Sequence, residues 1–245
     1  APEVPKGPSN SMPSAFKTAA VAGFVMITAL AIAIISVLRD TVKSESAYTD
    51  KIGSKLIGTV VHERSYYTLK DMFNRKKSKL IIDNAFVSFR FSESYQKIAS
   101  KFEYLNRNNG DKVFLITSVA ENEGKSTVAI NTALALAGRG KKVALVDMDF
   151  MKPAVKNYLK IESEEEDDIG IFISENRDIS KFKLKQYKST RLYLAVNTRR
   201  YSDYVNWINS VYVKDFIAKL REDFDYVIID TSPLSAAAEV TSLAR

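Results

Sequence analysis

VFLITSVAENEGKST, the stretch from Val113 to Thr127, decides the fold of this chain. Its first five residues form a short continuous apolar run, which is typical of a strand buried on both faces of a parallel sheet. Residues Ser126–Ala137 have a helix-forming composition, and Gly138 and Gly140 mark the end of that helix. A loop between a buried strand and a helix N-terminus presents closely spaced N–H groups to an anion. The stretch therefore predicts a phosphate-binding loop.

The residues at the end of this loop have the types that bind a nucleoside triphosphate and magnesium. Gly124 lets the backbone approach the phosphates, Lys125 neutralises the β- and γ-phosphates, and Ser126 places its hydroxyl on Mg²⁺. Thr127 can bind a further phosphate oxygen. The predicted nucleotide-binding residues are Glu123, Gly124, Lys125, Ser126 and Thr127, and the predicted ligands are ATP and Mg²⁺.

The loop departs from the general pattern G-x-x-x-x-G-K-[ST] in three respects. Val119 stands where the pattern has glycine. Asn122 stands where such loops often have glycine, and asparagine tolerates a positive φ better than most residues. Glu121 and Glu123 must point away from the phosphates. The loop is therefore a variant, and nucleotide binding is a firmer expectation than catalysis.

Two further apolar strands end in aspartate. Val143–Val146 is followed by Asp147 and Asp149, and Tyr226–Ile229 is followed by Asp230. Carboxylates at the ends of buried strands can hold Mg²⁺, and one can accept a proton from an attacking hydroxyl. Asp147, Asp149 and Asp230 are therefore candidate residues for metal binding and proton transfer at this site.

Strands and helices alternate through this part of the chain. A third strand is expected at Arg191–Val196 and an amphipathic helix at Val213–Arg221. The alternation predicts an α/β fold with a P-loop NTPase-type doubly wound parallel sheet, whose ligands lie at the carboxyl ends of the strands. We assign residues 91–245 to this domain, which starts with a helical pattern over Ser92–Leu105.

One transmembrane helix is expected ahead of the domain, at residues 18–38. This run has no charge and no proline, and its 21 residues span about 31 Å as a helix, close to the hydrocarbon thickness of a bilayer. A buried core helix and a cleaved signal peptide are the alternatives. Arg39-Asp40 follows the run in place of a small-residue cleavage site.

The flanks of the span predict its orientation. Residues 1–17 carry two lysines and four prolines, and we interpret them as an extended extracytoplasmic lead-in. Positive charges are more frequent after the span, which places residues 39–90 in the cytoplasm as a juxtamembrane linker. A short strand is expected in this linker at Lys55–Val61. The positive residues after the span are Arg39, Lys43, Lys51, Lys55 and Arg64.

Composition excludes several kinds of site. The chain has no cysteine, so disulfides, thiolate zinc sites and cysteine-bound iron–sulfur clusters are ruled out. His62 is the single histidine, expected on the surface, so no histidine cluster can bind a metal. The net charge of +7 leaves nucleic acid, an anionic membrane or anionic ligands open as partners.

The three motifs and the span together resemble the bacterial tyrosine kinases of capsular and exopolysaccharide synthesis, the CpsD/CapB and Wzc-like family, preceded by the end of a Wzz-like chain-length-determinant region. The family's P-G-E-G-K-S-T loop corresponds to residues 121–127. Its D-x-D-L-R-R-P motif corresponds to DMDFMKP at Asp147–Pro153, and its D-Y-V-I-I-D-T-P-P-L strand to DYVIIDTSPL at Asp225–Leu234.

The resemblance implies a membrane-anchored protein-tyrosine kinase that transfers the ATP γ-phosphate to tyrosine and regulates polysaccharide chain length and export. By position, the resemblance implies Lys125, Asp147 and Asp149 as catalytic residues, with Asp147 as the base for the tyrosine hydroxyl. It implies Ser126, Asp149 and Asp230 as metal ligands. The family's E-x-x-R-x-x-R assembly helix has Gln96 and Ala99 in place of both arginines, which weakens the expectation of a homo-oligomer. The implied partners are ATP, export proteins and the bacterial plasma membrane, with the kinase domain cytoplasmic and no nucleic acid.

Two alternatives stay open. The degraded loop and assembly helix suit a catalytically weak ATP-binding scaffold of the export machinery. A partitioning-type (ParA/MinD-like) ATPase usually has lysine at the position of Ala120, and a span directly upstream is unusual for that group.

Overall fold

The computed structural model describes residues 14–38, 54–63, 79–162, 164–175, 177–178, 181–201, 204, 207 and 210–234. Several residues discussed above lie outside these ranges: the lead-in 1–13, Arg39, Lys43, Lys51 and Arg64. By its contacts the chain divides into two compact units, Ala1–Leu56 and Ile57–Arg245. The start of the larger unit at Ile57 means that part of the predicted linker packs with the domain.

Helix α1, Ser14–Leu38, contains the predicted span. Its segment Ala15–Ile35 has a mean hydropathy of 2.4, and its most apolar residues are not buried against other parts of the described chain. A core helix of a soluble protein would have most of these residues buried. The Thr28 hydroxyl donates back to the carbonyl of Val25 at 2.9 Å, which satisfies it without water. By length and composition α1 can cross a bilayer.

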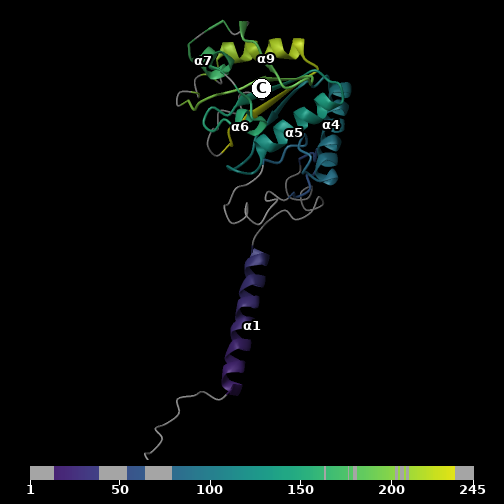
Figure 1. The fold of residues 1–245 in the computed structure, drawn as a ribbon. Helices are drawn as coiled ribbons and strands as arrows, with labels where there is room; N and C mark the ends of the chain where they lie inside the picture. The colour runs from purple at the N-terminus through teal and green to yellow at the C-terminus, as the bar shows by residue number, and fades with distance from the viewer. Residues whose placement is uncertain are drawn as a thin grey trace, which may run out of the picture. The chain divides into compact units, whose positions relative to one another are not determined.

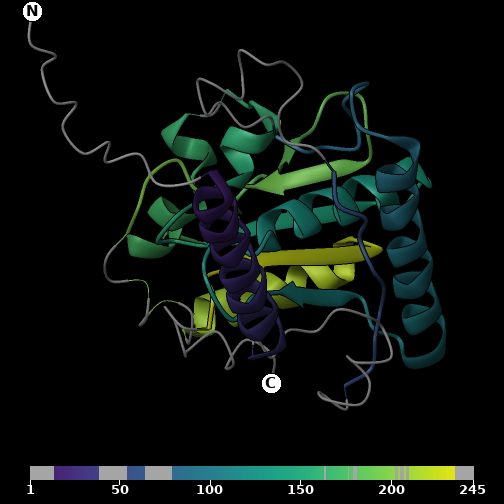
Figure 2. The ribbon, with the colours of Figure 1, turned by 90° about the horizontal axis from the view of Figure 1, so that it is seen from below.

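The larger unit contains a five-stranded sheet in the order β1-β5-β2-β4-β3 (Figure 2). Four adjacent strands are parallel to one another: β1 (Val113–Ile116), β5 (Tyr226–Thr231), β2 (Val143–Met148) and β4 (Leu192–Ala195). The edge strand β3 (Lys185–Gln186) is antiparallel to β4. The predicted α/β fold with a parallel-dominated sheet is confirmed.

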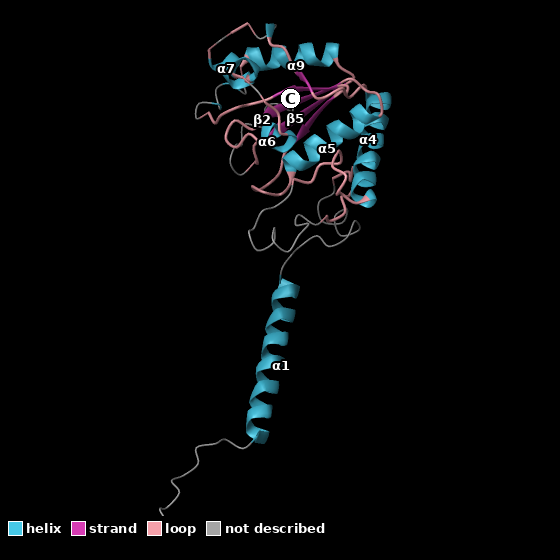
Figure 3. Cartoon of the chain, in the orientation of Figure 1, coloured by secondary structure: helices cyan, strands magenta, loops and turns pink. Residues whose placement is uncertain are grey.

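Helices cover both faces of the sheet, as Figures 1 and 3 show. Alternate residues of each strand enter two separate cores, which follows from the two-residue period of a strand. Leu145, Ile228 and Leu194 pack with α4 (Phe89–Asn109) and α5 (Lys125–Gly138). Val146, Ile229 and Ala195 pack with α7 (Ile169–Ser174) and α9 (Val211–Asp223). This arrangement is the doubly wound one that was predicted.

Helix α4 has clear boundaries. The Ser88 side chain accepts a hydrogen bond from the N–H of Phe91 at the first turn, and Gly110, with φ of 74°, ends the helix. Gln96 and Ala99, the positions where the related family has arginines, lie on α4, and Ala99 is fully buried. An arginine at position 99 would have to displace core atoms.

The chain preceding α4 also packs on the domain. The N–H of Val61 donates to the Ser94 hydroxyl at 3.4 Å. The buried Asn131 of α5 donates to the carbonyl of Leu80 at 2.8 Å and accepts from the N–H of Ile82 at 2.9 Å. One side-chain amide thus replaces a strand neighbour for this segment.

The strand predicted at Lys55–Val61 is wrong. The backbone there has no strand pairing, although apolar and polar residues alternate. A Cβ atom at Gly58 would lie 2.8 Å from Ile98 Cγ1, so this segment packs against the side of α4. Alternation by itself does not form a strand when the neighbour is a helix. His62, expected on the surface, is exposed.

Candidate nucleotide-binding site

The predicted phosphate-binding loop joins β1 to α5. Asn122 has φ of 62° and Gly124 has φ of 94°, and both lie in the left-handed region. The positive φ of Asn122 explains why asparagine suits a position at which related loops have glycine. Helix α5 begins at Lys125, so its first N–H groups and the positive end of its dipole meet at the end of the loop.

The two glutamates of the loop are held by partners of their own. Glu123 Oε2 accepts hydrogen bonds from the N–H groups of Val119 at 3.0 Å and Ala120 at 3.1 Å. Glu121 forms an ion pair with Lys152, from the loop after β2. Glu123 thereby closes the loop on itself at the position where the usual glycine is absent. The first N–H groups of α5 stay available to an anion.

Lys125 and Asp149 form the central ion pair of the site. Their Nζ and Oδ2 atoms lie 2.5 Å apart, and the two side chains are only 11% and 2% exposed. Asp149 Oδ1 accepts from the N–H of Lys152 and from the Ser232 hydroxyl, each at 2.9 Å. Burial raises the pKa of the Asp149 carboxyl, but Lys125 and the other donors outweigh it and hold that pKa below its usual value. The ion pair thus spans the loop and the end of β2.

Asp230, at the end of β5, is buried, and neither of its carboxylate oxygens has a hydrogen-bond partner within the described ranges. Burial raises its pKa to about 6, although the Lys125 charge and the nearby Ser126 hydroxyl, which lies outside hydrogen-bond geometry, oppose this. A buried carboxylate without a donor is unfavourable unless a cation joins it. Asp230 therefore fits a metal ligand.

Ser126, Asp149 and Asp230 supply a hydroxyl and two carboxylates, which suits magnesium held together with substrate phosphates. No group of three acidic or histidine side chains in the described part of the chain forms a ready-made metal cage. The residues fit an ion that is brought in with a nucleotide. The remaining coordination would come from phosphate oxygens and water.

Asp147 is oriented differently from the other two aspartates. It is fully buried, and its Oδ2 accepts from the N–H groups of Ala154 at 3.0 Å and Val155 at 3.1 Å, at the start of α6 (Val155–Leu159). Its Oδ1 accepts from the N–H of Asp149 at 3.2 Å. Burial, followed by repulsion from Asp230, raises its pKa well above the usual value. In this arrangement Asp147 organises the loop after β2, and its predicted role as a base stays a prediction.

Sequence reasoning missed three residues that support the site. Ser232 binds Asp149, and Asn197 donates to the carbonyl of Asp147 at 2.6 Å. Tyr158 of α6 lies 3.5 Å from the Thr127 hydroxyl, with Lys79 over its ring. Ser232 could have been found, because it follows a strand-end aspartate by two residues. Asn197 and Tyr158 carry no such signal.

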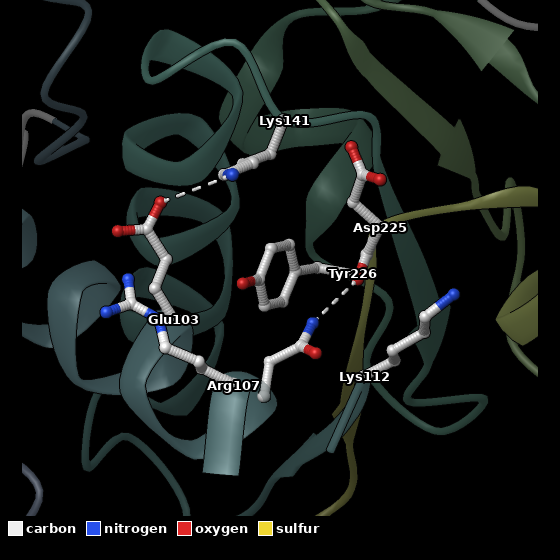
Figure 4. A pocket seen from close by; sticks show the side chains of 7 residues that line it. Glu103, Arg107, Lys112, Lys141, Asp225 and Tyr226 are labelled. Atoms are coloured by element: carbon white, nitrogen blue, oxygen red, sulfur yellow. Dashed lines mark hydrogen bonds and ion pairs between the residues drawn. The ribbon is translucent and has the colours of Figure 1, made fainter. Parts of the chain in front are cut away.

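A polar pocket of about 350 Å³ lies at the opposite end of the strands, where β1 and β5 begin; we call this end the amino edge of the sheet (Figure 4). Its carboxylates already have partners: Glu103 pairs with Arg139 at 2.7 Å, and Asp225 Oδ2 accepts from the N–H of Lys142 at 2.8 Å. Lys112 donates to the carbonyl of Arg221 at the end of α9, at 3.2 Å. We therefore place the candidate site at the carboxyl edge, where a buried carboxylate lacks a donor.

Comparison with known proteins agrees with this geometry. The model of a family described as "AAA domain" matches residues 114–244, more than half of the chain. The chain belongs to this AAA domain family. The match begins in β1 and includes the phosphate-binding loop and all three strand-end aspartates.

Relatives of this AAA domain include two curated tyrosine-protein kinases. YwqD of Bacillus subtilis (strain 168) is 27% identical over 161 residues, 62% of this chain and 63% of YwqD. CpsD of Streptococcus agalactiae serotype III (strain NEM316) is 26% identical over 166 residues, 67% of this chain and 70% of CpsD. The chain thus matches about two thirds of the length of these relatives. The resemblance to bacterial tyrosine kinases that the motifs indicated is confirmed, at low sequence identity.

Among solved structures, the BceF tyrosine kinase domain superposes with a TM-score of 0.68 at 17% identity, covering 82% of this chain and 81% of that domain. At this identity the similarity concerns the fold alone. The AAA domain described here therefore has the fold of that kinase domain.

Proposed function

We propose that this protein is a membrane-anchored protein-tyrosine kinase that transfers the γ-phosphate of ATP to tyrosine and regulates capsular or exopolysaccharide chain length and export. The observation that carries the proposal is the buried set formed by Lys125, Asp149 and Asp230 beside the N-terminus of α5. The names of the two curated relatives support the reaction class.

In this function the triphosphate binds the N–H groups at the start of α5, and Lys125 exchanges its contact with Asp149 for the β- and γ-phosphates. Magnesium, held by Ser126, Asp149 and Asp230 with the nucleotide, would supply charge neutralisation at the phosphates. The tyrosine oxygen forms a bond to the γ-phosphorus as the bond to the β-phosphate oxygen breaks. The phenolic proton passes to a carboxylate, and Asp147 is the predicted acceptor.

Helix α1 supports the anchoring part of the proposal, because it has the length and apolarity of a membrane span. The kinase domain would then lie on the cytoplasmic side of a bacterial plasma membrane, where ATP is present. Proteins of polysaccharide polymerisation and export are the partners that this location and the resemblance imply.

The second candidate is an ATP-binding scaffold with weak catalysis. A specific observation favours it: Asp147 is buried and receives three backbone N–H groups, so a tyrosine hydroxyl cannot reach it without movement of the loop after β2. The two candidates share the binding site and differ in the fate of the γ-phosphate.

Incubating the full-length chain with labelled ATP, Mg²⁺ and a tyrosine-containing polymer distinguishes them. For the kinase, wild type labels tyrosine, Lys125→Ala loses both label and ATP binding, and Asp147→Asn loses label but still binds ATP. Lys97→Ala, an exposed position on α4, is the control and keeps full activity. Tight ATP binding by wild type without phosphotyrosine would overturn the kinase and leave the scaffold.

A further inference from the structure

The hydroxyl of Tyr158 on α6 is paired only weakly in the free protein. It lies 3.5 Å from the Thr127 hydroxyl, in the first turn of α5, whereas hydroxyl groups in a normal hydrogen bond lie about 2.7–2.8 Å apart. Among the residues that the structure describes, neither hydroxyl has a second hydrogen-bond partner. Each carries one proton and the two share one bond, so one proton is left for a further acceptor at the start of α5.

The ring of Tyr158 is held by three sets of contacts. It packs, partly buried, against the core on the α5 side of the sheet. The Lys79 ammonium lies over the face of the ring, 4.1 Å from its centroid. Helix α6 is itself fixed to the end of β2, because the Asp147 carboxylate accepts from the N–H groups of Ala154 and Val155. The Tyr158 hydroxyl therefore has a defined position before any ligand binds.

The triphosphate proposed for this site supplies the missing acceptor. Lys125 is assigned to the β- and γ-phosphates and Ser126 to the metal, which leaves the α-phosphate to Thr127. A phosphate oxygen placed about 2.8 Å from both the Thr127 and the Tyr158 hydroxyls forms a triangle whose third side is their 3.5 Å separation. The long distance between the hydroxyls thus fits two donors on either side of one phosphate oxygen better than it fits a closed pair.

We propose that Tyr158 is a nucleotide-binding residue: its hydroxyl, together with that of Thr127, holds the α-phosphate of ATP, and Lys79 fixes the tyrosine ring for this contact. The proposal rests on the proposed ATP site and adds to it a residue of α6, outside the phosphate-binding loop. ATP and ADP both carry an α-phosphate, so both use this contact. Tyr158 therefore contributes to nucleotide affinity and takes no part in the transfer of the γ-phosphate.

Calorimetric titration of the full-length chain with Mg-ATP and Mg-ADP tests this proposal. Tyr158→Phe removes the hydroxyl and keeps the ring under Lys79, and it should weaken the binding of both nucleotides by about tenfold. Lys79→Gln keeps the hydroxyl and should weaken both by about twofold. The matched control is on α4, where Lys101 lies over the Tyr104 ring at 5.0 Å. Tyr104→Phe and Lys101→Gln should leave both affinities unchanged.

An ATP analogue with sulfur in place of one α-phosphate oxygen distinguishes a direct contact from support of the fold. Sulfur accepts a hydrogen bond more weakly than oxygen does. The diastereomer that places sulfur toward the two hydroxyls should therefore bind wild type several-fold more weakly than the other diastereomer. Tyr158→Phe should reduce this ratio of affinities. Because the ratio compares two ligands on the same protein, it stays informative even if the variant is less stable than wild type.

Three results would overturn the proposal: equal ATP affinities for wild type and Tyr158→Phe, an equal loss of affinity in Tyr104→Phe, or a diastereomer ratio that Tyr158→Phe leaves unchanged. Its failure is separable from that of the proposed function. A wild type that binds ATP through Tyr158 but labels no tyrosine would remove the kinase and leave this contact. Labelled tyrosine together with an unchanged affinity in Tyr158→Phe would do the reverse.

Discussion

Two ion pairs of similar geometry lie at opposite ends of the parallel strands and differ in how far water reaches them. At the carboxyl edge, the Lys125–Asp149 pair is 11% and 2% exposed; at the amino edge, the Arg139–Glu103 pair is 34% and 18% exposed. Their shortest distances are alike, 2.5 Å and 2.7 Å. Burial makes the first pair energetically significant, because water no longer screens it. Distance alone would have ranked the two pairs as equal.

Removing Lys125 should have the largest effect. Lys125→Ala leaves buried carboxylates without their cation, and we expect the free energy of unfolding to fall by about 3 kcal/mol at neutral pH. The loss should be smaller at pH 5 than at pH 8, because the uncompensated carboxylates take up protons. Urea unfolding at the two pH values measures this. A change of under about 0.5 kcal/mol would contradict the importance of burial.

Asp230→Asn should have the opposite sign. The folded pKa of Asp230, about 6, lies above the unfolded value of 3.8. The folded state therefore binds this proton more tightly, so its carboxylate adds no penalty below about pH 4, a growing one between pH 4 and 6, and a full one of about 2–3 kcal/mol above pH 6.

The nucleotide-free Asp230→Asn variant should accordingly be more stable than wild type at pH 7.5, by about 2 kcal/mol, with a flatter pH profile between pH 4 and 6. Thermal unfolding across this range measures it. Magnesium-dependent ATP binding should be lost in the same variant. Identical pH profiles for the two proteins would show that the buried Asp230 carboxylate does not destabilise the nucleotide-free protein.

Glu123→Ala tests the self-closed loop. Two N–H groups lose their acceptor at an exposed site, so we expect the free energy of unfolding to fall by at most about 1 kcal/mol. ATP binding should weaken by about fivefold, because the phosphates must then order the loop. Glu123→Gln keeps one acceptor oxygen and should restore most of the affinity. Calorimetric titration with Mg-ATP compares wild type, Glu123→Ala and Glu123→Gln. Equal affinities would show that Glu123 does not order the loop for ATP binding.

Arg139→Ala should have the smallest effect, under about 1 kcal/mol, because its pair with Glu103 is partly solvated. ATP binding should not change. Salt should reduce the effect further. A loss as large as that of Lys125→Ala would make the contrast between the two edges wrong.

Local patterns predicted most of the fold and the elements of the site. Apolar runs ending in aspartate identify β2 and β5, and the G-K-S-T segment identifies the start of α5, since each is encoded within a few adjacent residues. The direction of Asp147 was not predictable, because it depends on N–H groups seven and eight residues further along. The same holds for Asn197, whose partners are 27 and 50 residues away.

The prediction of a strand at Lys55–Val61 was wrong for a related reason, because strand formation also depends on residues far away in the sequence. Alternation describes which side chains face a core, but the backbone forms a strand only where a neighbouring strand offers free N–H and C=O groups. Here the neighbour is helix α4. The edge strand β3, only two residues long, had no pattern from which to be predicted.

The two hydrogen bonds of the Asn131 side chain join α5 to the segment that precedes α4. Asn131 grips the chain at Leu80 and Ile82, and it sits six residues beyond Lys125 on the same helix, about 9 Å along the axis. Helix α5 thus carries the segment that precedes α4 near its middle and Lys125 at its N-terminal end. A shift of the Leu80–Ile82 segment would therefore act on α5, and through it on the loop that precedes Lys125, without passing through the sheet.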